Sequence, residues 1–346
     1  DAWGYLLTGK SFEIMVGRGF SATVRSLLGM AIGAGICYCA YRMLFARQRK
    51  KKRRDKKGAN RTREKVPGRD LHGALTKPEN VSASVSDLQP HHLANLLDIL
   101  VTSSDSSLQE KVLITLCNSA AFSANHDIIR SLGGITIIAK SLSDSSEQIK
   151  VNALNALNNL SMNVQNQELI KDYINQTCSA ISLSSLNSEV QLAGLRLIIN
   201  MSVTDNYHNM VADHLPCFLY LLAEGNNIIQ IYTLKVLVNL SANPTMTQTL
   251  LTAKGSQSLT SLFDSRVDRE ILVRVLIFAA NLSKHLGSGH GYDLHANYNE
   301  DCLFNLLYGD SSPLQKDITA LFQYPDVEVK EQVVSLLINL ARLRQL

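Results

Sequence analysis

The chain has 346 residues, of which 45% are hydrophobic and only 7 are proline, a composition that favours helices and excludes a wholly disordered chain. Its net charge of +4 combines two opposite parts: residues 1–70 hold 17 Lys and Arg against 5 Asp and Glu, whereas residues 71–346 hold 17 against 25. The larger, acidic part is a poor candidate for binding nucleic acid, because such binding depends on neutralising phosphates.

The first predicted element is a membrane-spanning signal anchor over residues 27–46, preceded by an N-terminal segment, 1–26. No charged residue occurs from Ser26 to Tyr41. The apolar run covers about 22 Å as a helix. Because the aliphatic stem of Arg42 can reach the membrane surface, the helix can continue to about 20 residues, or about 30 Å, which matches the thickness of the hydrocarbon core of a bilayer. A cleavable secretory signal is the alternative, but a basic block stands where a cleavage site should follow. Gly29 and Gly33 form a GxxxG motif, a candidate contact between two anchors in a homodimer.

A basic collar follows at residues 47–57, with nine Lys and Arg in eleven residues. Three interpretations compete for this block: a topology determinant in contact with anionic lipids, a nuclear localisation signal, and a solvated charge run. Its position beside the apolar span favours the first, which keeps the C-terminal side of a single-pass protein in the cytosol. Residues 58–86 contain Gly, Pro and scattered charges without an apolar period and are expected to form a flexible linker.

A repeat of about forty residues is expected to fill residues 87–346. The first four intervals between the repeat asparagines are 41, 41, 39 and 42 residues, and the last, of 58, predicts an inserted loop at 287–300. Gly133 and Gly134 are expected to end one helix in a turn. Forty-residue helical units cannot bury their apolar faces alone, so the sequence predicts an all-α solenoid superhelix. Helical apolar stretches end at Asn118, Asn159, Asn200, Asn239, Asn281 and Asn339.

The repeat endings at 159–161, 239–241 and 281–283 read Asn-Leu-Ser and resemble the end of the third helix of the armadillo repeat. Together with the Gly-rich span and the basic collar, they make the chain similar to the ARMCX family of outer-mitochondrial-membrane armadillo proteins, and the short linker most resembles that family's autosomal member. The resemblance implies an armadillo-type solenoid in the cytosol, tethered to the mitochondrial outer membrane. It also implies an adaptor that influences mitochondrial distribution, transport and dynamics through the Miro and kinesin-adaptor machinery.

In armadillo solenoids the third helices line a groove, and residues four or seven apart share a helix face. No Trp stands four residues before a repeat asparagine, which disfavours a nuclear import receptor. Asn amides can pair with the backbone of an extended peptide, while Arg and Lys select acidic side chains. The alternative is that the asparagines only tie neighbouring repeats together and the charges are solvated. The predicted partner groove consists of Asn118, Asn155, Asn159, Arg196, Asn200, Lys235, Asn239, Arg274 and Asn281.

The sequence contains no GxxxxGK[ST], HExxH or GxSxG motif, and its six cysteines include no CxxC pair. His285, His290, Asp293 and His295 fit a solvated loop better than a metal site. We therefore expect a protein-binding adaptor without enzyme activity, cofactor or metal. The alternative function is an armadillo scaffold that acts in the nucleus or cytosol in transcriptional regulation.

Overall fold

The structure is a computed structural model, which describes residues 89–286, 298–309 and 312–343. These residues belong to one compact unit, Val81–Leu346, which contains the predicted repeat domain. The predicted N-terminal segment, anchor, collar and linker lie outside the described residues, and so do Gly29 and Gly33. Within the described ranges no helix combines the length and the apolar character needed to cross a membrane.

The described residues fold into helices joined by short turns, and they form no named β-strand. A seven-residue 3₁₀ segment, η8 (Gln257–Phe263), replaces an α-helix in one repeat. The α-helices are α3 (Pro90–Thr102), α4 (Ser106–Ala120), α5 (His126–Ser131), α6 (Gly134–Lys140), α7 (Glu147–Leu160), α8 (Val164–Ile170), α9 (Ile174–Leu183), α10 (Glu189–Met201), α11 (His208–Ala212), α12 (Leu215–Glu224), α13 (Asn227–Ala242), α14 (Thr247–Thr252), α15 (Arg269–Leu286), α16 (Leu303–Tyr308), α17 (Pro313–Phe322) and α18 (Val327–Leu343).

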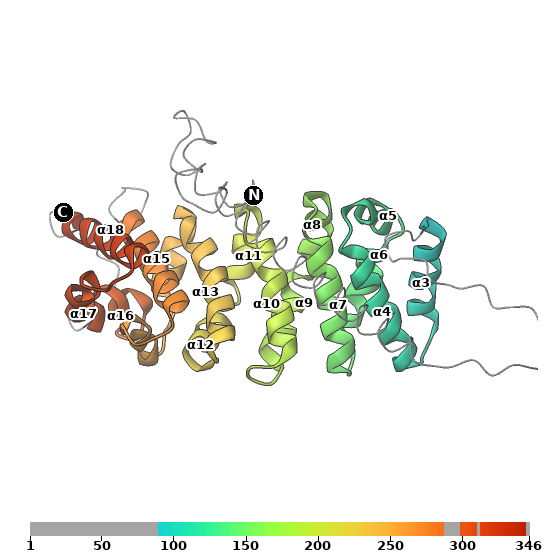
Figure 1. Cartoon of the computed structure of the whole chain (residues 1–346), viewed down its shortest axis with the longest axis horizontal. Coiled ribbons are helices and arrows are strands. Elements are labelled where there is room, and N and C mark those ends of the chain that lie inside the picture. Colours follow the sequence, from blue (N-terminus) through green and yellow to red (C-terminus); the bar gives the residue numbers. More distant parts are fainter. Residues whose placement is uncertain (1–88, 287–297, 310–311, 344–346) are drawn as a thin grey trace, which may run out of the picture. The chain divides into compact units, whose positions relative to one another are not determined.

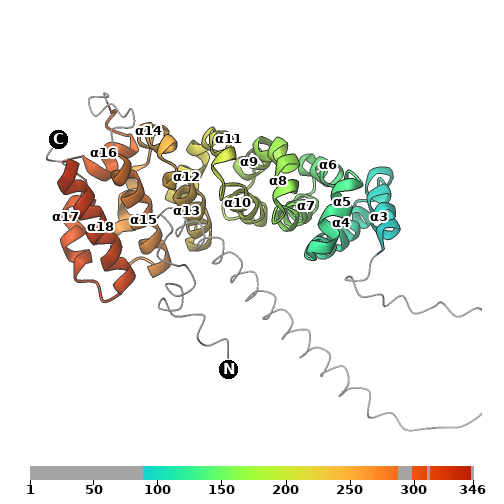
Figure 2. The ribbon, with the colours of Figure 1, turned by 90° about the horizontal axis from the view of Figure 1, so that it is seen from above.

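Six long helices, each the last of its repeat, form one layer of the fold. We call them the third helices: α4, α7, α10, α13, α15 and α18. Figure 1 shows them side by side in chain order, and each packs against the next. Figure 2 shows the shorter helices α6, α9, α11 and α14 on the opposite side. This two-layer stack confirms the predicted all-α solenoid.

Each third helix begins directly after a residue whose side chain accepts a backbone N–H of the first helical turn. Such a cap satisfies a donor that has no partner inside the helix, and its loss typically costs about 1 kcal/mol. Because the caps recur at the repeat spacing, they fix where each helix starts and therefore which residues reach its exposed face. The six capping residues are Asp105, Ser146, Ser188, Asn226, Asp268 and Asp326.

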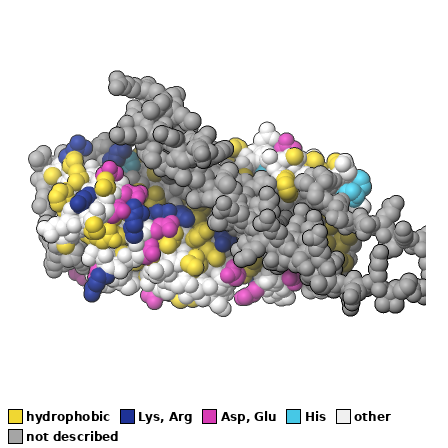
Figure 3. All heavy atoms as spheres, viewed as in Figure 1, with side chains coloured by type: hydrophobic (Ala, Val, Ile, Leu, Met, Phe, Trp, Pro, Cys, Tyr) yellow, Lys and Arg dark blue, Asp and Glu magenta, His cyan; other side chains and the backbone are white. Residues whose placement is uncertain are grey.

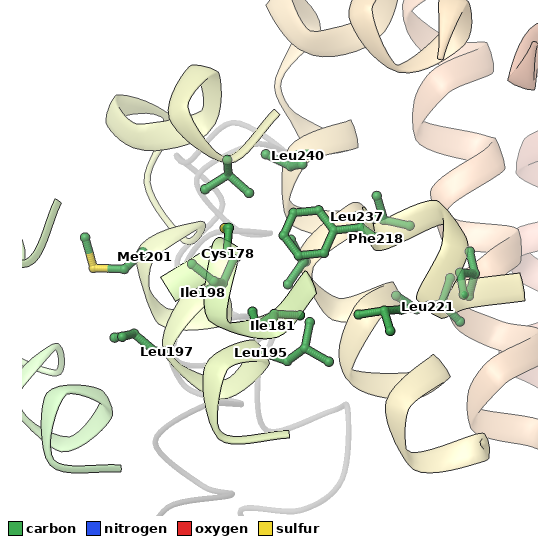
Figure 4. Close-up of a cluster of buried hydrophobic side chains, with 14 of the residues drawn as sticks. Cys178, Ile181, Leu195, Leu197, Ile198, Met201, Phe218, Leu221, Leu237 and Leu240 are labelled. Atoms are coloured by element: carbon green, nitrogen blue, oxygen red, sulfur yellow. The ribbon is translucent and has the colours of Figure 1, made fainter. Parts of the chain in front are cut away.

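The core lies between the two layers. Figure 4 shows a part of it, in which Phe218 of α12 lies in one cluster with Leu237 and Leu240 of α13, and all three are fully buried. Burial of such a side chain contributes about 1.5–3 kcal/mol. At Gly194 a Cβ atom would lie 2.5 Å from Cγ1 of Ile181. The missing side chain thus allows α10 to approach α9 closely and fixes the third helix against its own repeat.

The turn between α5 and α6 matches the prediction for Gly133 and Gly134. Gly133 has φ +69°, in the left-handed region that favours glycine, and α6 starts at the next residue. A Cβ atom on Gly134 would lie 2.8 Å from the carbonyl oxygen of Ile129. Both glycines are therefore needed for the tight connection between these helices.

Of the predicted insertion at 287–300, the structure describes only residues 298–300. After it, the chain rejoins the solenoid beside the end of α14. The backbone N–H of Leu303 donates to the carbonyl oxygen of Ala253 at 2.9 Å, and that of Gly255 donates to Asp301 at 2.8 Å. The interval of 58 residues therefore does not interrupt the stacking of α15 against α18.

Candidate partner-binding face

All nine predicted groove residues lie on third helices. We call the surface that they share the third-helix face. Asn118 is exposed and the other eight are half-buried, so none is lost in the core. Figure 3 looks onto this side and shows Lys and Arg side chains next to Asp and Glu side chains over α13 and α15. Their helices are α4 for Asn118, α7 for Asn155 and Asn159, α10 for Arg196 and Asn200, α13 for Lys235 and Asn239, and α15 for Arg274 and Asn281.

Five of the repeat asparagines connect each third helix to the one before it. Four donate from Nδ2 to a Ser Oγ of the preceding repeat at 2.9–3.1 Å. The fifth, Asn159, donates to the carbonyl oxygen of Cys117 at 3.0 Å. Each such hydrogen bond typically contributes about 0.5–1.5 kcal/mol. We call this set the Asn ladder: Asn159, Asn200, Asn239, Asn281 and Asn339.

The sequence left two roles open for the repeat asparagines: pairing with a partner's backbone, or tying neighbouring repeats together. The contacts of the Asn ladder agree with the second role. A side-chain amide has two N–H donors, and Nδ2 of both Asn200 and Asn239 reaches at least two acceptors in the preceding repeat. The side-chain amides of Asn118 and Asn155, by contrast, form no hydrogen bond with any other residue of the described ranges. Pairing with a partner's backbone stays a prediction, and these two amides are the best placed for it.

The three predicted cations lie together with two residues outside the predicted set. We call Arg196, Tyr232, Lys235, Glu270 and Arg274 the charged cluster. Cζ of Arg196 lies 5.7 Å and Nζ of Lys235 lies 4.5 Å from the centroid of the Tyr232 ring. Cations within about 6 Å of an aromatic ring are attracted by it. Tyr232 therefore holds two cations from neighbouring helices close to each other.

Glu270 supplies the only carboxylate of this cluster. Its Oε1 lies 2.8 Å from Nη2 of Arg274, four residues later on α15, and 3.7 Å from Nζ of Lys235 on α13. The three side chains are 44%, 27% and 31% exposed, respectively. Solvent-accessible pairs of this kind contribute about 0–1 kcal/mol to stability. Arg196 has no acidic partner among the residues that the structure describes, so the cluster carries a net positive charge.

Sequence reasoning missed Tyr232 and Glu270, although both stand at helical spacings from a predicted cation. Tyr232 precedes Lys235 by three residues, and Glu270 precedes Arg274 by four. Residues at these spacings are neighbours on a helix surface. A search for side chains that flank the cations, rather than for the cations alone, would have found both.

Three of the cysteines in the described part have thiols whose pKa is raised. Burial raises the pKa of Cys117 to about 11, and it also raises the pKa of Cys178 and Cys217. Such thiols stay protonated near neutral pH and are weak nucleophiles. No group of His, Cys, Asp and Glu side chains in the described ranges is arranged to hold a metal ion. His290, Asp293 and His295 lie outside those ranges, and His285 lies near the end of α15.

Known proteins match this fold. A family model described as armadillo-like matches residues 88–308. A designed armadillo repeat protein in complex with the peptide (KR)4 superimposes with a TM-score of 0.58 at 17% sequence identity, covering 72% of this chain and 99% of that chain. A structure of computationally designed armadillo repeat proteins for modular peptide recognition superimposes with a TM-score of 0.59 at 16% sequence identity, covering 71% of this chain and 99% of that chain. At these identities the likeness concerns the fold, and it confirms the armadillo type of the predicted solenoid.

Proposed function

We propose that this chain, which belongs to the armadillo-like family, is a non-enzymatic scaffold whose third-helix face captures an extended, acidic segment of a protein partner. The observation that carries this proposal is the charged cluster, with three cations from successive third helices and one carboxylate. Arginine presents a planar fork of donors that suits a carboxylate. Asn118 and Asn155 offer amides for the backbone of the same segment.

The geometry of the stack suits an extended ligand. Neighbouring packed helices lie about 8–10 Å apart, and an extended chain advances about 3.3 Å per residue. One repeat therefore corresponds to roughly three residues of a bound segment. A peptide of alternating Glu and Ser places its carboxylates on one side at about 7 Å intervals. This spacing is shorter than the distance between neighbouring helices, so the peptide offers at least one carboxylate to each cation of the row.

A triple charge reversal tests this function. Arg196→Glu, Lys235→Glu and Arg274→Glu together should weaken binding of a labelled Glu/Ser peptide at least about tenfold, because attraction becomes repulsion, and the loss should shrink as salt is added. Fluorescence anisotropy measures the binding, and circular dichroism checks that helicity is kept. The matched control reverses three exposed cations outside the third helices, Lys140, Lys254 and Arg266. A folded triple variant that binds the peptide as the unmodified protein does would contradict the proposal.

The proposed scaffold is tethered to the cytosolic side of the mitochondrial outer membrane. Support comes from the sequence: the apolar residues 27–46, the basic collar at 47–57, and the similarity of both to the ARMCX family. In that setting the partners are proteins of the Miro and kinesin-adaptor machinery. The resulting function is an influence on mitochondrial distribution, transport and dynamics.

The tether has its own test, independent of the peptide assay. Protease added to intact mitochondria that carry the full chain should remove residues 87–346, because the basic collar holds the C-terminal side in the cytosol. Immunoblotting against the repeat domain measures the loss, with a matrix protein as the protected control. Full protection of the repeat domain would overturn this topology.

A further inference from the structure

The carboxylate of Glu270 already lies where a partner's carboxylate would bind. It contacts Nη2 of Arg274 at 2.8 Å and approaches Nζ of Lys235 to 3.7 Å. We propose that Glu270 is a built-in occupant of this site, and that an acidic side chain of a partner binds between Arg274 and Lys235 by replacing it. This inference rests on the proposed function of the third-helix face and names the residue that sets its selectivity.

Glu270 is held by a single short contact, the one with Arg274 at 2.8 Å, and exposed ion pairs of this kind contribute little to stability, so it can be exchanged. The distance to Lys235 exceeds that of a hydrogen bond, which ends near 3.2 Å, and the side chain is 44% exposed. The neighbouring Arg269 shows what a fixed ion pair looks like here. Its guanidinium contacts both oxygens of Asp326 at 2.6 and 3.1 Å and Oε2 of Glu328 at 2.8 Å, and thereby ties α15 to α18.

A displaced Glu270 is not left in an unfavourable place. It is the second residue of α15, and the first turn of a helix favours a negative charge. Lys235 has a second contact that does not involve Glu270, because its ammonium lies 4.5 Å from the centroid of the Tyr232 ring. The exchange therefore leaves Glu270 in a favourable place on the helix and leaves Lys235 in contact with Tyr232.

The arrangement selects for partners with more than one acidic residue. Arg196, which has no acidic partner in the described part of the chain, accepts a first carboxylate without competition. A second carboxylate must replace Glu270 at Lys235 and Arg274, and it is repelled by Glu270 until it does. Glu270 therefore lowers the affinity for every acidic segment and keeps weakly charged ones from binding.

The substitution Glu270→Gln tests this inference with little change of shape. Gln keeps a hydrogen-bond acceptor for Arg274 but removes the charge. Affinity for the labelled Glu/Ser peptide should rise about three- to tenfold at about 50 mM salt, and the gain should shrink at about 300 mM. Glu224→Gln is the matched control, because Glu224 is an exposed residue at the end of α12 and its substitution changes the net charge equally. A thermal melt confirms that both variants are folded.

The outcomes separate this inference from the function on which it rests. If Glu270→Gln tightens binding and Glu224→Gln does not, the inference holds. Equal tightening by both variants would show an effect of net charge alone and would overturn it. If Glu270→Gln leaves the affinity unchanged or weakens it while the triple charge reversal abolishes binding, the inference is wrong and the acidic-peptide function stands. If neither the triple reversal nor Glu270→Gln changes binding, both fall.

Discussion

Two third helices, α7 and α13, are built alike but present different surfaces. Both follow a side-chain cap, and both carry an asparagine of the Asn ladder, Asn159 or Asn239. Four residues before that asparagine, α7 carries Asn155, whereas α13 carries Lys235, whose ammonium lies beside the ring of Tyr232. One helix thus offers neutral amides and the other a cation with an aromatic neighbour.

This difference separates two roles along the same helix. The ladder position is occupied by Asn in both helices because its partner is the preceding repeat, which is present in both. The position four residues earlier is free to differ, because its side chain faces the third-helix surface and contributes little to stacking. Binding selectivity therefore varies from repeat to repeat without disturbing the tie that holds the repeats together.

The largest expected effect that distinguishes the surface around α7 from the charged cluster is the slow alkylation of Cys117. This residue lies on α4, and its carbonyl oxygen and sulfur face Asn159 of α7. Burial raises the pKa of this thiol from its ordinary 9.0 to about 11. At about pH 8 the thiolate fraction falls about a hundredfold, so iodoacetamide should alkylate Cys117 about a hundredfold more slowly in the folded than in the urea-unfolded chain. Peptide-level mass spectrometry measures both rates. Equal rates would mean that the thiol of Cys117 is not buried and that its pKa is not raised in the folded chain.

The framework of this comparison could be predicted from the sequence. The forty-residue period located the third helices, and helical spacing placed Arg196, Lys235 and Arg274 on one surface. Residues that share a helix face are set by local geometry, which a sequence reveals directly. The caps were equally readable, since Ser146, Ser188 and their equivalents recur at the repeat spacing, although the prediction made no use of them.

The remaining features depend on contacts between residues far apart in the sequence. Asn200 donates to Ser161, 39 residues earlier, and Glu270 approaches Lys235, 35 residues earlier. Whether an amide serves a neighbouring repeat or is free for a partner is decided by the stacking distance between helices, which periodicity does not give. The sequence also could not predict that the chain returns to the end of α14 after the insertion. This contact consists of two backbone hydrogen bonds, which leave no pattern of side chains in the sequence.

The smaller expected effect sharpens the comparison by testing two asparagines of the same surface against each other. Asn200→Ala removes a donor that reaches Ser161 at 2.9 Å and the carbonyl oxygen of Asn158 at 3.2 Å, and it should lower the free energy of unfolding by about 1–3 kcal/mol. Asn155→Ala removes an amide that has no hydrogen bond within the described residues, and its effect should stay within about ±0.5 kcal/mol. Urea unfolding measures both. The order should reverse in the Glu/Ser peptide assay, where only Asn155→Ala should weaken binding, because the amide of Asn155 is free for a partner and that of Asn200 is engaged. Equal losses of stability would mean that the ladder does not carry the stacking, and an unchanged affinity of Asn155→Ala would remove α7 from the binding surface and leave the charged cluster alone.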